Sequence, residues 1–185
     1  MDTKTERSKT TDMALTGMMT ALICILGPLS IPVPVSPVPV SLVQLGIYLS
    51  VYILGKRRGT LAVLLYVIIG AVGLPVFSGF SGGFAKLVGP TGGYILGYVF
   101  MAYFAGLVIE RSSGDIIAVF AGFAVANALC YVPGTLWLSF QMGTGFKKAL
   151  LLGVVPYVPA DLIKTIAAMI ICPVIVQRLK TRNLV

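Results

Sequence analysis

The sequence predicts an all-α integral membrane protein, and three observations support that prediction. Hydrophobic residues make up 57% of the 185 residues. Charged residues make up only 11%, whereas a soluble domain carries about 25%. The apolar runs are continuous rather than alternating, which argues against a membrane β-barrel. Since backbone polar groups in lipid must be satisfied within a helix or a closed barrel, the chain is expected to form a bundle of spanning helices.

Six apolar stretches predict six transmembrane helices, roughly at residues 13–30, 40–54, 60–74, 92–109, 116–140 and 157–176. The second and third are shorter than the roughly 20 residues that a perpendicular span needs. They are separated only by the charged segment Gly55-Lys-Arg-Arg-Gly59, so we expect a tight hairpin. The alternative is that both segments enter the membrane without crossing it.

The distribution of basic residues predicts which side each end of a helix faces. Ten of the 14 lysines and arginines fall on one side of the six-helix arrangement: Lys4, Arg7, Lys9, Lys56, Arg57, Arg58, Arg111, Arg178, Lys180 and Arg182. The positive-inside rule places this side, with both termini, in the cytoplasm. We therefore expect a cytoplasmic tail at residues 1–12, a membrane domain at 13–177 and a basic cytoplasmic tail at 178–185. Topology and anionic lipid then account for the net charge of +8, and no nucleic-acid partner is expected.

The first outer loop is rich in proline, with prolines at positions 32, 34, 37 and 39. Proline fixes φ and disfavours the α region in the residue before it, so this loop is expected to be extended and stiff. One interpretation is a rigid apolar strap over the outer mouth of the bundle. The other is a hairpin linker with no role in ligand binding.

The next outer loop, residues 73–94, is rich in glycine and carries Phe77, Phe80, Phe84 and Tyr94. It ends where the fourth predicted helix begins, so free N–H groups and the positive end of the helix dipole face outward. Together with Lys86, this helix end is a candidate site for a carboxylate. Alternatively, the glycines only allow a tight turn between two helices.

Asp161 and Lys164 are the two charged residues within the last apolar stretch. Residues at i and i+3 share a helix face, and ionisable groups in a membrane segment usually face a cavity, a partner or a substrate. The pair is therefore the first candidate for a binding site. The alternative is a helix start, in which Pro159 begins the helix, Asp161 favours its positive end and Lys164 extends toward the outer surface.

The chain lacks residues that several classes of enzyme need. Gly79-Phe-Ser-Gly-Gly83 fits the serine-hydrolase patterns G-x-S-x-G and G-x-S-G, but the chain contains no histidine, which leaves only Lys86 or Lys164 as a base for Ser81. The P-loop pattern is absent, so any ATP-driven function requires a partner. Three dispersed cysteines predict neither a disulfide nor a metal site. We expect no catalytic residues and no cofactor.

The first predicted helix carries a possible docking surface. Gly17 and Ala21 form a small-xxx-small pair, which allows close approach of another helix. The alternative is that this pair packs inside the bundle.

Four segments together resemble the BioY family, the biotin-binding S components of energy-coupling-factor (ECF) vitamin importers. They are Gly73-Leu-Pro-Val-Phe77, Ser81-Gly-Gly83, Gly89-Pro-Thr-Gly-Gly-Tyr94 and Pro159-Ala-Asp161-Leu-Ile-Lys164. The resemblance covers nearly the whole chain. It implies a multi-pass protein of the prokaryotic cytoplasmic membrane that works with a transmembrane coupling protein and two ATPase subunits.

The resemblance also implies roles for individual residues. Asp161 would accept from the ureido N–H groups of biotin, and Lys164 would donate to its carbonyl. The other implied substrate-binding residues are Val38, Gln44, Phe77, Ser81, Gly82, Lys86, Gly93 and Tyr94. Some members of the family carry an amide at the position of Ser81 and a basic residue at that of Ile95. The biotin carboxylate is therefore expected to use Lys86, the start of the fourth helix, or water. A different vitamin is the alternative substrate.

Overall fold

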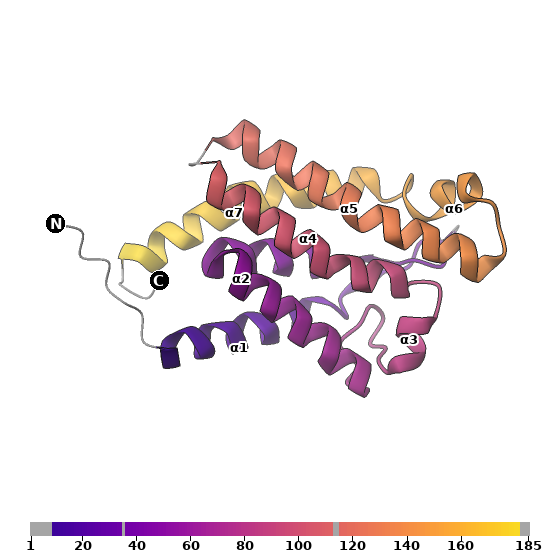
Figure 1. The fold of residues 1–185 in the computed structure, drawn as a ribbon, viewed down its shortest axis with the longest axis horizontal. Coiled ribbons are helices and arrows are strands. Elements are labelled where there is room, and N and C mark those ends of the chain that lie inside the picture. The colour runs from indigo at the N-terminus through magenta and orange to yellow at the C-terminus, as the bar shows by residue number, and fades with distance from the viewer. Residues whose placement is uncertain (1–8, 35, 113–114, 182–185) are drawn as a thin grey trace.

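A computed structural model describes residues 9–34, 36–112 and 115–181. Over these residues the chain forms seven helices and one pair of two-residue strands. In chain order they are α1 (Lys9–Leu26), β1 (Ser30–Ile31), β2 (Val40–Ser41), α2 (Val43–Val72), α3 (Phe84–Val88), α4 (Gly92–Arg111), α5 (Ile116–Met142), α6 (Phe146–Gly153) and α7 (Val158–Thr181). The long helices form an elongated bundle (Figure 1), in line with the predicted all-α class.

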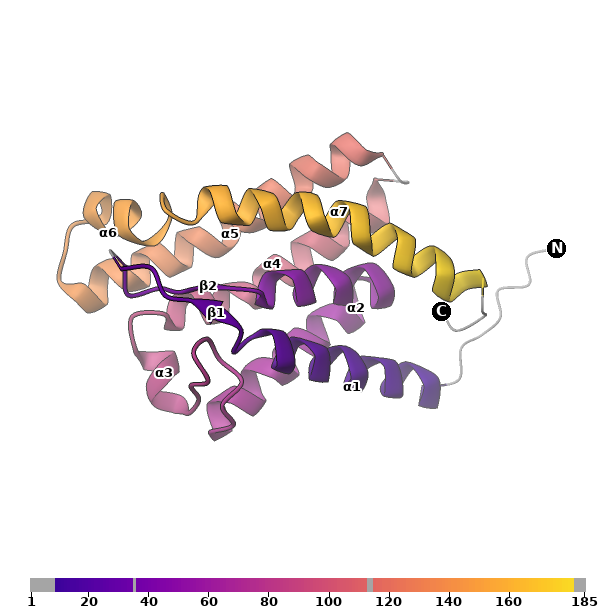
Figure 2. The same ribbon diagram turned by 180° about the vertical axis from the view of Figure 1, so that it is seen from behind.

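The two ends of the bundle differ in what they contain. α1 begins and α7 ends at the same end, which we call the terminal end (Figure 1). The β1–β2 pair, α3 and α6 all lie at the opposite end, which we call the loop end (Figure 2). Residues 1–8 and 182–185, which hold Lys4, Arg7 and Arg182, lie outside the described residues.

α2 is a helical hairpin rather than one straight helix. Gly55 has φ 74° and ψ 178°, a conformation that strongly favours glycine, and interrupts the helix there. The two halves then fold back on each other and pack closely. A Cβ at Gly59 would lie only 2.8 Å from the Cα of Val51. The expected hairpin is therefore present, but its turn is shorter than the predicted segment 55–59, and the second half begins directly after Gly55.

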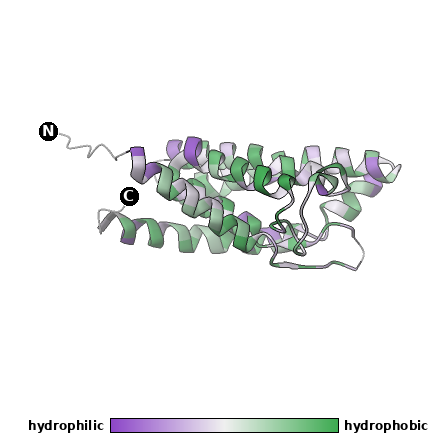
Figure 3. Ribbon diagram, turned by 90° about the horizontal axis from the view of Figure 1, so that it is seen from below, coloured by the Kyte–Doolittle hydropathy of each residue, from purple (hydrophilic) through white to green (hydrophobic). Residues whose placement is uncertain are grey.

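Four helices in the described part of the chain are long and apolar enough to cross a membrane: Lys9–Leu26, Gly92–Arg111, Ile116–Met142 and Val158–Leu179. Hydrophobic residues, in green, occupy much of the helical bundle (Figure 3). Residues 43–54, the first half of α2, span about 18 Å at about 1.5 Å per residue, less than the roughly 30 Å hydrocarbon core. The chain is thus a multi-pass α-helical membrane protein by length and composition.

α4 lies at the centre of the bundle, packed against both α2 and α5, while α1 packs against α2 and α7 packs mainly against α2. Stacked rings of Tyr48 and Phe123, with centroids 4.0 Å apart, join the first half of α2 to α5 in the core. Many large apolar side chains remain exposed on the outside, including Ile25, Phe100, Phe140 and Ile170. In a membrane protein these side chains face lipid.

The loop end contains structure that the sequence did not predict. α6 was missed because its eight residues carry Lys147 and Lys148 and are too short to span a membrane. α3 occupies five residues of what was expected to be a glycine-rich loop. The described residues of the proline-rich loop, 31–34 and 36–40, are non-helical as expected, and the antiparallel pairs Ser30–Ser41 and Ile31–Val40 join the two ends of the loop. At the terminal end, both helices extend beyond the predicted apolar stretches 13–30 and 157–176. α1 begins at Lys9 and α7 ends at Thr181, and the added residues are mostly polar.

Candidate ligand-binding site

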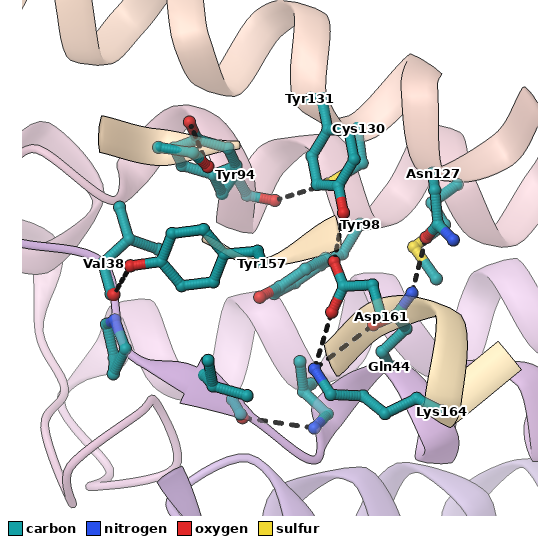
Figure 4. Close-up of a pocket in the computed structure, with 16 residues that line it drawn as sticks. Val38, Gln44, Tyr94, Tyr98, Asn127, Cys130, Tyr131, Tyr157, Asp161 and Lys164 are labelled. Carbon is teal, nitrogen blue, oxygen red and sulfur yellow. Dashed lines mark hydrogen bonds and ion pairs between the residues drawn. The ribbon is translucent and has the colours of Figure 1, made fainter. Parts of the chain in front are cut away.

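A pocket lies at the loop end, where β2 and the starts of α2, α4 and α7 meet the middle of α5. Its empty volume, including the open mouth, is about 480 Å³. We call it the main pocket. It is lined by Val38, Pro39, Val40, Ser41, Val43, Gln44, Tyr94, Tyr98, Met101, Asn127, Cys130, Tyr131, Gly153, Tyr157, Asp161 and Lys164 (Figure 4).

The charged pair of α7 faces this pocket. α7 begins at Val158, so Asp161 lies in its first turn and Lys164 one turn further along. The Lys164 Nζ is 2.8 Å from the Asp161 Oδ1, and the two side chains are only 10% and 13% exposed. Asp161 therefore does sit at a helix start, as one interpretation of the sequence expected, and the same turn brings both charges to the pocket wall.

Polar side chains from two other helices hold the pair in place (Figure 4). Tyr131 of α5 donates its hydroxyl hydrogen bond to the Asp161 Oδ2. The Lys164 Nζ donates to the Gln44 Oε1 at 3.4 Å. Buried polar groups without partners are costly, so this arrangement keeps the site intact when no ligand occupies it.

Asn127 connects this network to the core. Its Oδ1 accepts from the Gln44 Nε2 at 2.5 Å and from the Tyr48 hydroxyl at 3.1 Å. Its Nδ2 donates to the Thr165 Oγ1 at 3.4 Å. The sequence analysis missed both Asn127 and Tyr131. A lone amide inside the predicted apolar stretch 116–140 was the available signal, because an uncharged polar group in a membrane helix also requires a partner.

The opposite wall of the pocket is apolar and aromatic. Residues 36–39, the second half of the proline-rich loop, form the strap, and its Val38 and Pro39 line the pocket. The Tyr157 hydroxyl donates to the Val38 carbonyl, which ties the strap to the residue before α7 (Figure 4). Tyr94 is fixed in turn, because its hydroxyl donates to the Gly153 carbonyl at 3.1 Å. The proline-rich loop thus covers the pocket, in agreement with the strap interpretation.

A second pocket adjoins the first at the start of α4. Its empty volume is about 330 Å³, and we call it the side pocket. It shares Val38, Pro39, Tyr94 and Tyr98 with the main pocket, and Tyr66, Phe77, Ser78, Lys86, Thr91 and Ile95 complete its lining. The start of α4 and the glycine-rich loop are thereby placed next to the main pocket.

The two pockets bring together seven of the ten predicted substrate-binding residues. Five of them line the main pocket: Val38, Gln44, Tyr94, Asp161 and Lys164. Phe77 and Lys86 line the side pocket. Ser81, Gly82 and Gly93 line neither pocket.

The last three residues have local structural roles. The Ser81 hydroxyl donates to the Ser78 carbonyl at 2.8 Å inside its own loop rather than to a described lysine, so the hydrolase alternative gains no support. A Cβ at Gly82 would lie 2.2 Å from the Leu74 carbonyl oxygen. Gly93 allows α4 to approach α5, because a Cβ there would lie 2.4 Å from the Cβ of Trp137.

Gly17 and Ala21 line neither pocket, and both lie on the exposed side of α1. A Cβ at Gly17 would meet no described heavy atom within 4 Å. This position therefore does not pack inside the bundle, which removes the internal-packing alternative for Gly17.

The chemistry of the main pocket defines a class of ligand. Asp161 offers carboxylate acceptors and Lys164 offers ammonium donors side by side, which suits a group with N–H donors next to a carbonyl. The remaining wall suits apolar ligand atoms. The fold and the site therefore define a multi-pass membrane protein with a pocket that places an acidic and a basic side chain beside an apolar, aromatic wall.

Comparison with known proteins gives this class a family. A model of the BioY family matches residues 1–181, and the chain belongs to the BioY family. The biotin transporter BioY of Thermotoga maritima is 43% identical over 155 residues, covering 84% of this chain and 89% of the relative. The probable biotin transporter BioY of Pyrococcus horikoshii is 37% identical over 163 residues, covering 88% and 94%.

A solved structure has the same fold. The crystal structure of the S-component for biotin from an ECF-type ABC transporter superposes with a TM-score of 0.83 at 31% sequence identity. The alignment covers 96% of this chain and 94% of that one. Relatives and fold thus identify the chain as a transporter subunit rather than an enzyme.

Proposed function

We propose that this chain captures biotin outside the cell and delivers it inward as the substrate-binding subunit of an ATP-driven importer. The observation that carries the proposal is the buried Asp161–Lys164 pair, held in contact beneath the proline strap in a chain of the BioY family. Biotin is the ligand in the names of the relatives and of the matching structure.

In this proposal the ureido ring of biotin binds at the start of α7. The N–H groups donate to Asp161, and the ring carbonyl accepts from Lys164. Biotin would take over the hydrogen bond that Gln44 now accepts from Lys164, while Tyr131 keeps its hydrogen bond to Asp161 and orients the carboxylate. The sulfur ring and the valeryl chain would contact Val38, Tyr94 and Tyr98, which line the adjacent wall.

The proposed topology has six crossings with both termini in the cytoplasm of a prokaryotic cell. Lys56 and Glu110, whose Nζ and Oε2 are 3.3 Å apart, lie at the terminal end, as does the Arg58–Asp12 pair. The terminal end carries most of the basic residues, which supports its cytoplasmic placement. Residues 1–12 and 178–185 would be cytoplasmic tails, and 13–177 the membrane domain.

The proposed partners are a transmembrane coupling protein and two ATPase subunits, with no resident cofactor in this chain. Gly17 and Ala21 would be the docking surface on α1, since both are exposed and small. Gly17→Leu should then block uptake while leaving biotin binding by the purified chain unchanged. Met18→Leu, at an exposed neighbour, is the matched control, and equal uptake by both variants would contradict this docking surface.

Uptake in living cells tests the transport function. Bacteria that lack their own biotin importer would express this chain with the coupling protein and both ATPase subunits of an ECF transporter. We expect accumulation of labelled biotin that requires all the components and is not reduced by excess thiamine or riboflavin. Competition by another vitamin would favour the alternative substrate. No uptake by a chain that is present in the membrane would contradict the proposal.

A further inference from the structure

A chain of hydrogen bonds leads from the charged pair of α7 through two amides and back to α7. The Lys164 Nζ donates to the Gln44 Oε1 at 3.4 Å. The Gln44 Nε2 donates to the Asn127 Oδ1 at 2.5 Å (Figure 4), and the Asn127 Nδ2 donates to the Thr165 Oγ1 at 3.4 Å. Gln44, Lys164 and Thr165 are at most 8% exposed. Each polar atom in this chain is therefore satisfied by its neighbour rather than by water.

The direction of these hydrogen bonds follows from the chemistry of Lys164. An ammonium group has three donors and no acceptor, so the Gln44 atom that faces it has to be the amide oxygen. The Gln44 nitrogen then faces Asn127, whose oxygen accepts from it. Turning the Gln44 amide over would place its N–H groups against the ammonium, donor against donor. The orientation of this one amide is therefore a defined property of the site.

Asn127 is the anchor for the Gln44 amide. Its Oδ1 also accepts from the Tyr48 hydroxyl at 3.1 Å, and the buried Tyr48 ring stacks on Phe123 of α5. The only other described partner of the Gln44 nitrogen is the Tyr48 hydroxyl, at the longer distance of 3.4 Å. An amide oxygen has two lone pairs, and both are used here. Asn127 lines the main pocket, but its oxygen is thus committed to Gln44 and Tyr48.

The orientation of Gln44 matters because this side chain lines the main pocket beside the charged pair. The Lys164 ammonium is one donor within reach of two acceptors, the Gln44 oxygen and the Asp161 carboxylate. A cyclic urea presents the opposite set, which is one carbonyl acceptor between two N–H donors. A reversed Gln44 amide would instead turn N–H groups toward the N–H groups of such a ring. The polarity of Gln44 therefore bears on which ring the pocket accepts.

We propose that Asn127 is a specificity-determining residue that acts through Gln44, by holding the Gln44 oxygen toward the ring-binding end of the main pocket. This inference rests on the proposed biotin-binding function. In the free chain the oxygen accepts from Lys164. When the ring carbonyl takes over that hydrogen bond, the same oxygen remains on the pocket wall as an acceptor beside the ring. Asn127 is thus a positioning residue, and its loss frees the Gln44 amide to turn.

Three variants test this role by equilibrium binding of biotin to the detergent-purified full chain. Asn127→Leu removes the anchor at similar size, and we expect affinity to fall about tenfold. Asn127→Asp still directs an oxygen toward Gln44, so affinity should stay within about threefold of wild type. In a chain that already carries Gln44→Leu, adding Asn127→Leu should change affinity by less than about twofold, because no amide remains to be oriented.

Thr20→Val is the matched control for the loss of a buried hydrogen bond. The Thr20 hydroxyl donates to the Ala62 carbonyl at 3.3 Å and lines neither pocket, so this variant should bind biotin like the wild type.

Four outcomes would overturn the positioning role while leaving biotin capture standing. They are unchanged affinity in Asn127→Leu, equal losses for leucine and aspartate at position 127, an equal loss in Thr20→Val, and a loss for Asn127→Leu that is the same with and without Gln44. Failure of the wild-type chain to bind biotin would overturn both proposals.

Discussion

The two ends of the proposed ligand site differ in how their polar groups are satisfied. At the start of α7, Asp161 and Lys164 contact each other, and Tyr131 and Gln44 supply further hydrogen bonds. At the start of α4, the Thr91 hydroxyl and Lys86 have no such partners among the described residues.

This difference shows how one pocket can combine stability with selectivity. The α7 end lies among apolar helices, where an unpaired charge is expensive, so its polar groups pair with one another until a ligand replaces some of those contacts. The α4 end lies beside exposed loop residues, where a lysine without a partner is tolerated. We infer that the neutral ring of the ligand is recognised at the α7 end.

Asp161→Asn should have the largest effect, because it breaks the α7 end directly. The amide loses the negative charge that two charge-assisted hydrogen bonds need, each worth about 1.5–3 kcal/mol. We expect biotin affinity to fall about 100-fold or more in isothermal titration calorimetry. Asp115→Asn is the matched control, since Asp115 only caps the start of α5. Affinity within about twofold of wild type would show that Asp161 is not a ligand contact.

Tyr131→Phe should have a smaller effect, because it removes only a hydrogen bond that orients Asp161. We expect biotin affinity to fall about tenfold, the value of one hydrogen bond to a charged group. The same titration should show no change for Tyr103→Phe, whose tyrosine is 44% exposed on α4. If both variants bind like the wild type, Asp161 does not depend on this support.

Gly55→Ala should affect binding least, since it lies at the terminal end and touches neither pocket. An alanine cannot easily adopt φ 74° and ψ 178°, so the α2 hairpin should lose about 1–3 kcal/mol of stability. Thermal unfolding in detergent should show a lower midpoint, with biotin affinity within about twofold of wild type. Gly17→Ala, at an open helical position, should not lower the midpoint. An unchanged midpoint for Gly55→Ala would mean that the turn is not under this constraint.

Much of this arrangement follows from local sequence. The charge-poor apolar runs predict the helices, the prolines predict the extended strap, and the spacing of Asp161 and Lys164 predicts that both face one cavity. The short charged segment Gly55-Lys-Arg-Arg-Gly59 between two apolar stretches predicts the hairpin. Each of these inferences depends on residues close together in the chain, where geometry is nearly fixed by helix periodicity and by the φ preferences of proline and glycine.

What the sequence did not predict depends on contacts between distant segments. Asn127 and Tyr131 belong to α5, and only the packed bundle places them against Gln44 and Asp161. The unsatisfied hydroxyl of Thr91 could not be predicted either, because a threonine before a helix ordinarily caps it. α6 was missed for a different reason, since its eight residues include two lysines and are too short to span a membrane.

The most direct test of ring recognition at Asp161 and Lys164 is calorimetric titration of the purified wild-type chain with two ligands. One is biotin, and the other is the diamine that remains when the ureido carbonyl of biotin is removed. The diamine keeps the sulfur ring and the carboxylate but lacks the urea. We predict tight binding of biotin and affinity for the diamine at least about 100-fold weaker. Equal affinity for both ligands would contradict recognition of the ureido group by this pair.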